Sequence, residues 1–157
     1  MKQINLTKGK AALVDDKHFE RVNAFKWHYS NSGYALRKIY KGTRNGKKLY
    51  ENQAMHRLLV DIPDGMQIDH INGDKLDNRQ ANLRQCTNQQ NGCNRGKTAK
   101  NTSGFKGVSP CEYGRWQAGI RVNGKRLHLG HFLKKEDAAE AYKAAAIKLH
   151  GEFACAE

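Results

Sequence analysis

Short apolar runs, separated by polar and charged turns, divide the first third of the chain into small elements. The runs at 11–14, 34–40 and 48–50 are rich in Ala, Leu and Tyr, and runs of this length are typical of β-strands. Asn45-Gly46 separates the last two runs, and Asn-Gly is a strong short-range signal for a β-hairpin. We therefore predict a basic hairpin in this part of the chain.

Two short helices are expected beside these strands, one beginning at Asp15 and one over 55–59. The first helix would bury Phe19 and Val22. Three aromatic residues follow it, and they are interpreted as core rather than as platforms for nucleic-acid bases, because aromatics in so small a module are more often core. They are Trp27, Tyr29 and Tyr34. His56, in the second helix, is interpreted as structural rather than as a DNA contact or a support of the site.

The last third of the chain alternates apolar and polar residues over 105–108, 115–122 and 125–132, with Asn123-Gly124 as the turn between the last two runs. Such alternation predicts three antiparallel strands with one apolar and one basic face. The apolar face is assigned Trp116, Ala118, Ile120, Val122, Leu127 and Leu129. The opposite face is assigned Arg115, Gln117, Gly119, Arg121, Arg126 and His128.

A helix over 135–150, closed by Gly151, is predicted after these strands. Apolar residues recur along it at helical spacing and form a stripe that can cover the apolar face of the sheet. The stripe comprises Ala138, Ala141, Tyr142, Ala145 and Leu149. The patterns together predict an α+β fold in four segments. These are a basic, hairpin-rich segment (1–55), a central module (56–95), a polar linker (96–104) and a three-stranded sheet packed on one helix (105–157).

The 157 residues carry a formal charge of +13, which is unevenly placed. Residues 1–55 contain 12 basic and 4 acidic side chains, 56–95 contain five of each, and 96–157 contain 11 and 6. A neutral centre between two cationic segments fits a protein that grips phosphates on both sides of a reaction site. Taken alone, this charge also fits a basic protein that binds no nucleic acid.

No apolar run approaches 18 residues and the start lacks an apolar signal region, so we expect a cytoplasmic protein, in the host cytoplasm if a phage encodes it. The four cysteines lack the spacing of zinc ligands and are interpreted as free thiols. They are Cys86, Cys93, Cys111 and Cys155. A metal half-site formed by Cys86 and Cys93 is the less favoured alternative.

The central module concentrates residues that phosphodiester hydrolysis requires. Asp69-His70 is followed by Asn82-Leu83-Arg84 and by Asn91. Histidine titrates near neutral pH and can take a proton from an attacking water. Carboxylate and amide oxygens bind hard divalent cations, which neutralise the charge that develops on the phosphate. His70 is thus the candidate base, and Asp69 and Asn91 are candidate metal ligands.

Neighbouring residues on a strand point to opposite faces, so Asp69 and His70 can share a site only where the backbone bends or the strand ends. Asn72-Gly73-Asp74 is a strong turn signal directly after them, and 82–94 is polar enough for a surface helix that carries Asn91. Asn82 would then hold the loop.

The segment from His56 to Asn91 resembles the HNH endonucleases, whose ββα-metal finger has Asp-His on its first strand, Asn-Leu-Arg after the loop and a metal-ligating Asn or His on its helix. The resemblance implies His70 as general base, Asn82 as a brace of the loop, and Asp69 with Asn91 as ligands of Mg²⁺ or Mn²⁺. Asn91 at the last position resembles the pattern of the phage and intron homing-type branch of this family. A metal site with oxygen ligands only favours Mg²⁺ over Zn²⁺. Arg57 and Arg84, two basic residues of the same segment, are further candidate DNA contacts.

Residues 101–157 show a second pattern, carried by Gly107-Val108, Arg115-Trp116, Asn123-Gly124-Lys125, Leu129-Gly130-His131-Phe132 and Ala138-Ala139-Glu140-Ala141-Tyr142. It resembles the plant apetala-two and ethylene-response-factor DNA-binding domain, whose sheet lies in the major groove. The resemblance implies a DNA-facing set of Lys106, Arg115, Arg121, Arg126 and His128. Ser109-Pro110-Cys111 stands where arginines are usual, so the base specificity of that family does not transfer.

Together the two resemblances describe a homing-type endonuclease, a metal-dependent enzyme that prefers certain sites in double-stranded DNA. One finger per chain favours a monomer that nicks. No membrane and no small-molecule substrate are expected. Two alternatives stay open: a DNA-binding regulator with an inactive finger, and a basic module that binds RNA or protein.

Overall fold

The computed structural model describes residues 1–155, whose contacts separate two units, Met1–Thr87 and a second unit that begins at Asn88. Helices account for 31% and strands for 35% of these residues, so the predicted α+β class is confirmed. The four segments expected from the sequence stay a prediction. Among residues 1–155, no helix is both long enough and apolar enough to cross a membrane.

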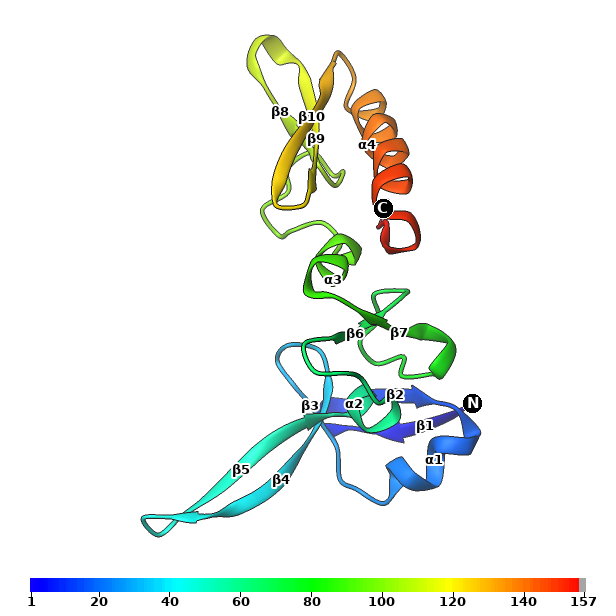
Figure 1. Ribbon diagram of the computed structural model, residues 1–157, viewed down its shortest axis with the longest axis vertical. Coiled ribbons are helices and arrows are strands. Elements are labelled where there is room, and N and C mark those ends of the chain that lie inside the picture. Colours follow the sequence, from blue (N-terminus) through cyan, green and yellow to red (C-terminus); the bar gives the residue numbers. More distant parts are fainter. Residues whose placement is uncertain (156–157) are drawn as a thin grey trace. The chain divides into compact units, whose positions relative to one another are not determined.

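The first unit contains three small antiparallel sheets, in the strand orders β1-β2, β3-β4-β5 and β6-β7. Its strands are β1 (Lys2–Asn5), β2 (Ala11–Val14), β3 (His28–Tyr29), β4 (Ala35–Arg44), β5 (Lys47–Ala54), β6 (Gln67–His70) and β7 (Leu83–Cys86). Its helices are α1 (Asp16–Asn23) and α2 (Met55–Leu59), with short 3₁₀ turns at Thr7–Gly9 and Gln80–Asn82. The long β4–β5 hairpin stands out from the rest of this unit (Figure 1).

The predicted hairpin is confirmed at its turn. Asn45 and Gly46 have φ values of 50° and 71° between β4 and β5. This left-handed pair matches the right-handed twist of the two strands, and Asn and Gly tolerate it better than other residues do. The two predicted helices are also present, as α1 and α2.

The core of the first unit forms where α1 and α2 pack near β1, β2 and the start of β4. Its buried members are Ile4, Leu6, Ala12, Val14, Val22, Trp27, Ala35 and Met55. The indole of Trp27 donates a 2.8 Å hydrogen bond to the carbonyl of Val22 at the end of α1. The interpretation of Trp27 as core is therefore confirmed, and this ring is not available for stacking on a base.

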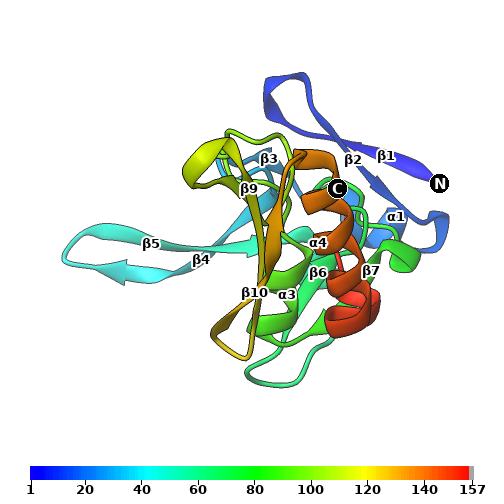
Figure 2. The same cartoon turned by 90° about the horizontal axis from the view of Figure 1, so that it is seen from above.

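The second unit is a three-stranded antiparallel sheet in the order β10-β9-β8, covered on one face by α4. Its elements are α3 (Asn88–Asn94), β8 (Val108–Pro110), β9 (Trp116–Val122), β10 (Lys125–Phe132) and α4 (Lys135–His150), with 3₁₀ turns at Glu112–Gly114 and Gly151–Phe153. Figures 1 and 2 show α4 running alongside the sheet. The predicted helix and its closing glycine, Gly151 with φ 54°, are confirmed.

The apolar face of this sheet follows the predicted alternation on β9, where Ala118 and Ile120 are fully buried against α4. Leu127 also lies on the predicted face, since it is directly opposite Ile120, but it is 49% exposed on the edge strand β10. One assignment on α4 was wrong, because Ala146 is buried while Leu149 is 39% exposed. A bulge between His128 and Gly130 gives β10 an extra residue, which alternation alone does not predict.

Two predicted element positions were also wrong. The first strand of the second unit begins at Val108 rather than at 105, because Gly107 forms a turn with φ 72°. An added Cβ at Gly107 would lie 2.1 Å from the Tyr142 ring, so close packing requires glycine there. In place of one helix over 82–94, the chain forms β7 and then α3, because 83–86 pairs with β6.

The end of the expected linker is folded into the second unit. Ser103 is buried, and its hydroxyl lies 2.9 Å from the carbonyl oxygens of both Phe105 and Val108. Asn101 accepts a hydrogen bond from the backbone of Gly104 and donates one to the carbonyl of Phe105. Residues 101–104 therefore form a hydrogen-bonded loop that leads into β8.

Candidate active site

The Asp-His pair lies at the end of the two-stranded ribbon β6–β7. In its antiparallel register Asp69 is opposite Arg84, and His70 is opposite Leu83. Asp69 and His70 are the last two residues of β6, and both are buried, with 5% and 4% of their surface exposed. Both residues therefore lie buried where the strand ends, and their use of one common site stays a prediction.

Arg84 holds the carboxylate of Asp69 in place. Its Nε and Nη2 donate hydrogen bonds of 2.9 and 2.7 Å to Oδ2 of Asp69. The Arg84 side chain is only 12% exposed, so the pair is largely shielded from solvent. Arg84 was expected to contact DNA, and in this structure its guanidinium orients Asp69 through charge-assisted hydrogen bonds.

Asn82 joins the two ends of the loop between β6 and β7. Its Oδ1 accepts a 2.9 Å hydrogen bond from the backbone of Asn72, and its Nδ2 donates a 2.8 Å bond to the carbonyl of Asp77. Its own carbonyl accepts from the backbone of Ile71. Because Ile71 directly follows His70, these bonds fix the backbone at the end of β6.

A second set of buried polar groups supports the middle of the loop. Asp77 accepts bonds of 2.7 and 2.6 Å from Arg79 and a 3.0 Å bond from Asn72. These hydrogen bonds, those of Arg79 first, hold the pKa of Asp77 below its ordinary value. Asn78 is 1% exposed, and its backbone pairs with the carbonyl of Leu13 on β2. Sequence reasoning included Asp77 and Asn78 in the pattern but gave them no role.

The imidazole of His70 lies among other rings. Its ring centroid is 5.1 Å from that of His56 on α2 and 6.0 Å from that of Tyr34, and the rings of His56 and Tyr34 are 5.4 Å apart. Burial lowers the pKa of His56 to about 3. Burial also lowers the pKa of His70, although Asn78 and the carboxylates of Asp69, Asp74 and Asp77 act in the opposite direction. Both imidazoles are therefore neutral at physiological pH.

Sequence reasoning missed Tyr34 as a neighbour of His70, and for His56 it favoured a structural role over support of the site. They precede His70 by 36 and 14 residues, and the tertiary fold of the first unit brings them to it. Of the remaining predicted residues, Arg57 is exposed on α2, and Asn91 lies half-buried on α3 of the second unit.

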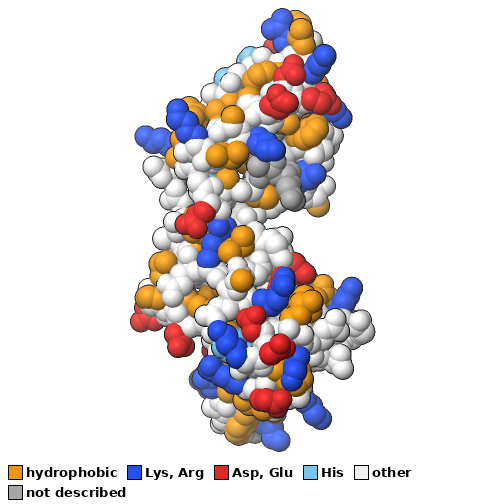
Figure 3. Space-filling model, turned by 90° about the vertical axis from the view of Figure 1, so that its right-hand side faces the viewer, with side chains coloured by type: hydrophobic (Ala, Val, Ile, Leu, Met, Phe, Trp, Pro, Cys, Tyr) orange, Lys and Arg blue, Asp and Glu red, His pale blue; other side chains and the backbone are white. Residues whose placement is uncertain are grey.

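The predicted basic face of the second unit carries exposed side chains of Arg115, Arg121, Arg126 and His128. Arg121 and Arg126 are directly opposite each other on β9 and β10. Gly119 makes room for Arg126, since an added Cβ there would lie 2.8 Å from its Nε. His131, which the sequence analysis placed in the motif but not in the DNA-facing set, has its ring 4.6 Å from that of His128. Figure 3 shows that Lys and Arg side chains are spread over both units, with Asp and Glu side chains among them.

Lys106, the fifth member of the predicted DNA-facing set, differs from the other four. Its side chain is half-buried, and its Nζ donates a 2.7 Å hydrogen bond to the carbonyl of Cys93 on α3. The expected DNA contact thus has a partner inside its own unit.

A ribbon that ends in Asp-His, with its loop tied by an asparagine, defines a nuclease finger, and residues 61–93 match the family model described as HNH endonuclease. Over 149 residues the chain is 31% identical to an uncharacterized HNH endonuclease of Acanthamoeba polyphaga mimivirus, covering 94% of this chain and 74% of that protein. The chain belongs to the HNH endonuclease family.

Two further relatives match only part of the chain. Protein 3.8 of Escherichia phage T7 is 35% identical over 94 residues, which cover 59% of this chain and 77% of that protein. An AP2-like ethylene-responsive transcription factor of Oryza sativa subsp. japonica is 50% identical over 56 residues, which cover 34% of this chain and 9% of that protein. The likeness to the plant factor is therefore confined to one segment.

Proposed function

We propose that this protein is a divalent-metal-dependent DNA endonuclease of homing type, which nicks preferred sites in duplex DNA as a monomer. Membership of the HNH endonuclease family supports a nuclease with a DNA substrate. The observation that carries the proposal is the buried Asp69-His70 pair at the end of β6, next to a loop tied by Asn82.

In the proposed mechanism His70 is the general base. Its imidazole is kept neutral by burial, so its nitrogen can accept the proton of the water that attacks the phosphorus. The rings of His56 and Tyr34 limit its rotation. Asn82 acts through the backbone, because its hydrogen bonds fix the residues that follow His70. In this mechanism the rings of His56 and Tyr34 orient the imidazole of His70, and the hydrogen bonds of Asn82 fix the backbone beside it.

The proposed metal ligands are Asp69 and Asn91, which offer a carboxylate and an amide oxygen. Within residues 1–155 no three side chains of His, Cys, Asp or Glu are grouped to hold a metal ion. Two oxygen ligands fit Mg²⁺ or Mn²⁺, since Mg²⁺ commonly takes one or two carboxylates and completes its shell with waters and phosphate oxygens. A bound cation would supply charge neutralisation at the scissile phosphate and at the leaving oxygen.

The second unit is proposed to supply site preference. Its sheet and helix have the arrangement expected of an apetala-two-like module, and the match to the plant factor supports this assignment. The exposed face of β9 and β10 carries Arg121, Arg126 and His128. A two- or three-stranded ribbon of this kind fits the major groove, where Arg reads guanine.

Metal dependence is tested with supercoiled plasmid DNA. We expect nicked circles in the presence of Mg²⁺, none in excess EDTA, and recovery with Mn²⁺. Asp69→Ala should raise the Mg²⁺ concentration for half-maximal cleavage, because it removes an oxygen ligand. Asp61→Ala, an exposed acid outside the site, is the matched control and should change nothing. Full cleavage by the wild type in EDTA would show that the metal mechanism is wrong.

Site preference is tested with Arg121→Ala. If Arg121 reads a guanine, we expect a loss of about 1–3 kcal/mol in binding that is confined to one base position. A phosphate contact would instead weaken all sequences alike and lower the salt slope by about one unit. Binding to a library of duplexes at two salt concentrations separates these outcomes. Unchanged affinity for every duplex would remove Arg121 from the DNA-facing set.

The alternative function, a DNA-binding regulator with an inactive finger, is favoured by one observation. Asp69 already has a cationic partner in Arg84, with two hydrogen bonds to one carboxylate oxygen. If that pair persists on DNA, it competes with a metal ion for the carboxylate. Sequence-preferring binding without any cleavage in Mg²⁺ or Mn²⁺ would establish the regulator.

A further inference from the structure

Helix α3 depends on its neighbours for its structure. It has seven residues, Asn88–Asn94, and none of them is buried. Isolated helices of fewer than about 12 residues are marginal in water, because nucleation is costly and few hydrogen bonds follow it. Helix α3 therefore needs contacts outside itself, and two of them join it to the rest of the second unit.

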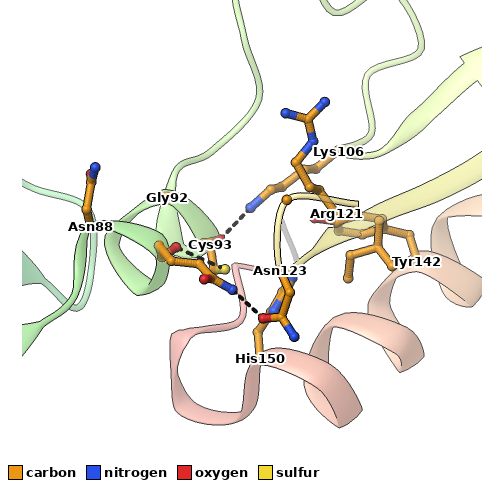
Figure 4. A pocket seen from close by; sticks show the side chains of 11 residues that line it. Asn88, Gly92, Cys93, Lys106, Arg121, Asn123, Tyr142 and His150 are labelled. Carbon is orange, nitrogen blue, oxygen red and sulfur yellow. Dashed lines mark hydrogen bonds between the residues drawn. The ribbon is translucent and has the colours of Figure 1, made fainter. Parts of the chain in front are cut away.

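One of these contacts is at the carboxyl end of α3. The ammonium group of Lys106 donates a 2.7 Å hydrogen bond to the carbonyl of Cys93. The carbonyls of a last helical turn have no partner within the helix, and a cation there also complements the helix dipole. In Figure 4 the Lys106 side chain reaches across a pocket to this turn. Lys106 thus fixes the end of the helix.

The second contact is at the amino end of α3. Nε2 of Gln89 donates a 2.8 Å hydrogen bond to Oδ1 of Asn123. Asn123 has φ 50° and forms, with Gly124, the turn between β9 and β10. A pocket of about 580 Å³ lies between the two contacts and is lined by residues of α3, β9 and α4, including Tyr142 and His150. The helix is therefore joined at two points on either side of this pocket, to the loop that leads into β8 and to the turn between β9 and β10.

The turn that holds α3 also separates the two arginines of the proposed DNA-reading face. Arg121 precedes Asn123 by two residues, and Arg126 follows Gly124 by two residues. DNA gripped by Arg121 and Arg126 would constrain the turn, and through Gln89 the turn would constrain α3. Asn91 lies on that helix, two residues after Gln89.

We propose that Lys106 and Asn123 are positioning residues, which fix α3 on the DNA-reading sheet so that DNA bound to the sheet orders the helix that carries Asn91. This proposal rests on the proposed function, which makes Asn91 a metal ligand. It assigns to Lys106 a role in coupling recognition to cleavage in place of a direct DNA contact.

The experiment compares Lys106→Met and Asn123→Gly with two controls in the full chain. Met keeps the length of the lysine and removes its donor, and Gly preserves the left-handed turn and removes the amide acceptor. Lys143→Met, on the exposed surface of α4, matches the first variant. Asn45→Gly matches the second, because Asn45 also has φ 50° in an Asn-Gly hairpin turn. Lys106→Arg, which keeps a donor, should restore function.

Three quantities are measured: hydrogen exchange of the 88–94 amides, the Mg²⁺ concentration for half-maximal cleavage, and DNA affinity. In the wild type, duplex DNA should slow exchange in 88–94. In both variants that protection should be lost and the Mg²⁺ requirement should rise by about tenfold or more, as when groups that orient a metal ligand are removed. DNA affinity should stay within about twofold, and neither control should differ from the wild type.

Asn91→Ala separates the two proposals. If it leaves the Mg²⁺ requirement unchanged, the assignment of Asn91 fails, while the exchange data still test whether α3 is ordered by DNA. If Asn91→Ala raises the requirement but Lys106→Met and Asn123→Gly leave both exchange and Mg²⁺ dependence unchanged, the positioning proposal is overturned. A uniform loss of DNA affinity in Lys106→Met would also overturn it, and would make Lys106 a phosphate contact.

Discussion

His70→Ala is expected to lower the rate of DNA cleavage by at least about 10²-fold, which is the lower range for removal of a general base. The affinity for DNA should be nearly unchanged, because the charge that grips phosphates lies mainly outside 56–95. The His70 side chain is buried, so its loss exposes no new charge to the duplex. Cleavage measured with enzyme in excess over DNA, beside a binding titration, checks both statements.

A cavity at a buried site can also disturb the fold, so the result needs a matched variant. His28→Ala removes a partly buried histidine of β3 from the same unit, one to which no role in the proposed site is assigned. It should cleave as the wild type does, and both variants should unfold cooperatively. Equal cleavage by His70→Ala under matched Mg²⁺ would reject the general base. Loss of cleavage together with loss of cooperative unfolding would call for His70→Asn, which should retain the fold and still be inactive.

The elements that the sequence predicted correctly are those set by neighbouring residues. Asn45-Gly46 and Asn123-Gly124 form turns because their own side chains favour left-handed backbone. The helix over 135–150 ends at Gly151 for the same local reason. Alternation on β9 placed Ala118 and Ile120 correctly because that strand is central in its sheet.

The wrong assignments arose where a distant partner decides the outcome. Residues 83–86 are polar enough for a helix and become a strand because β6 pairs with them. Lys106 carries a charge that suits DNA, but the carbonyl of Cys93 lies within its reach. None of these contacts can be read from a short window of sequence.

In the candidate site, too, some features are set by neighbouring residues and others by residues far away in the sequence. Asp69, His70 and Asn82 lie within 14 residues, so their spacing alone suggested a strand end and a tied loop. The rings that orient His70 come from α2 and from the segment before β4, and the Asp69–Arg84 pair requires the register of β6 and β7. The strand end and the tied loop were therefore predictable from the motif, whereas the side chains that surround and desolvate His70 were not.

The stability of the loop itself should depend most on Asp77. Its carboxylate is 3% exposed and accepts hydrogen bonds from Arg79 and Asn72. Arg79 is 39% exposed, so water can solvate it when its partner is removed. The cost of Asp77→Ala is therefore set by the lost charge-assisted hydrogen bonds, about 2–3 kcal/mol, rather than by a charge left buried. For a unit of this size that corresponds to a fall in Tm of roughly 10–20 °C.

The pH dependence gives this prediction its sharpest check. Because the pKa of Asp77 in the folded protein lies below its ordinary value of 3.8, the carboxylate contributes stability above that value, and the contribution is lost as the pH falls through the lowered pKa. The difference in unfolding free energy between wild type and Asp77→Ala should thus be constant from about pH 5 to 8 and shrink below about pH 4. Asp64→Ala, an exposed acid, should leave stability unchanged throughout. Denaturant unfolding across this range decides the matter, since a difference that persists undiminished at the lowest pH would show that packing, rather than the charge of Asp77, stabilises the loop.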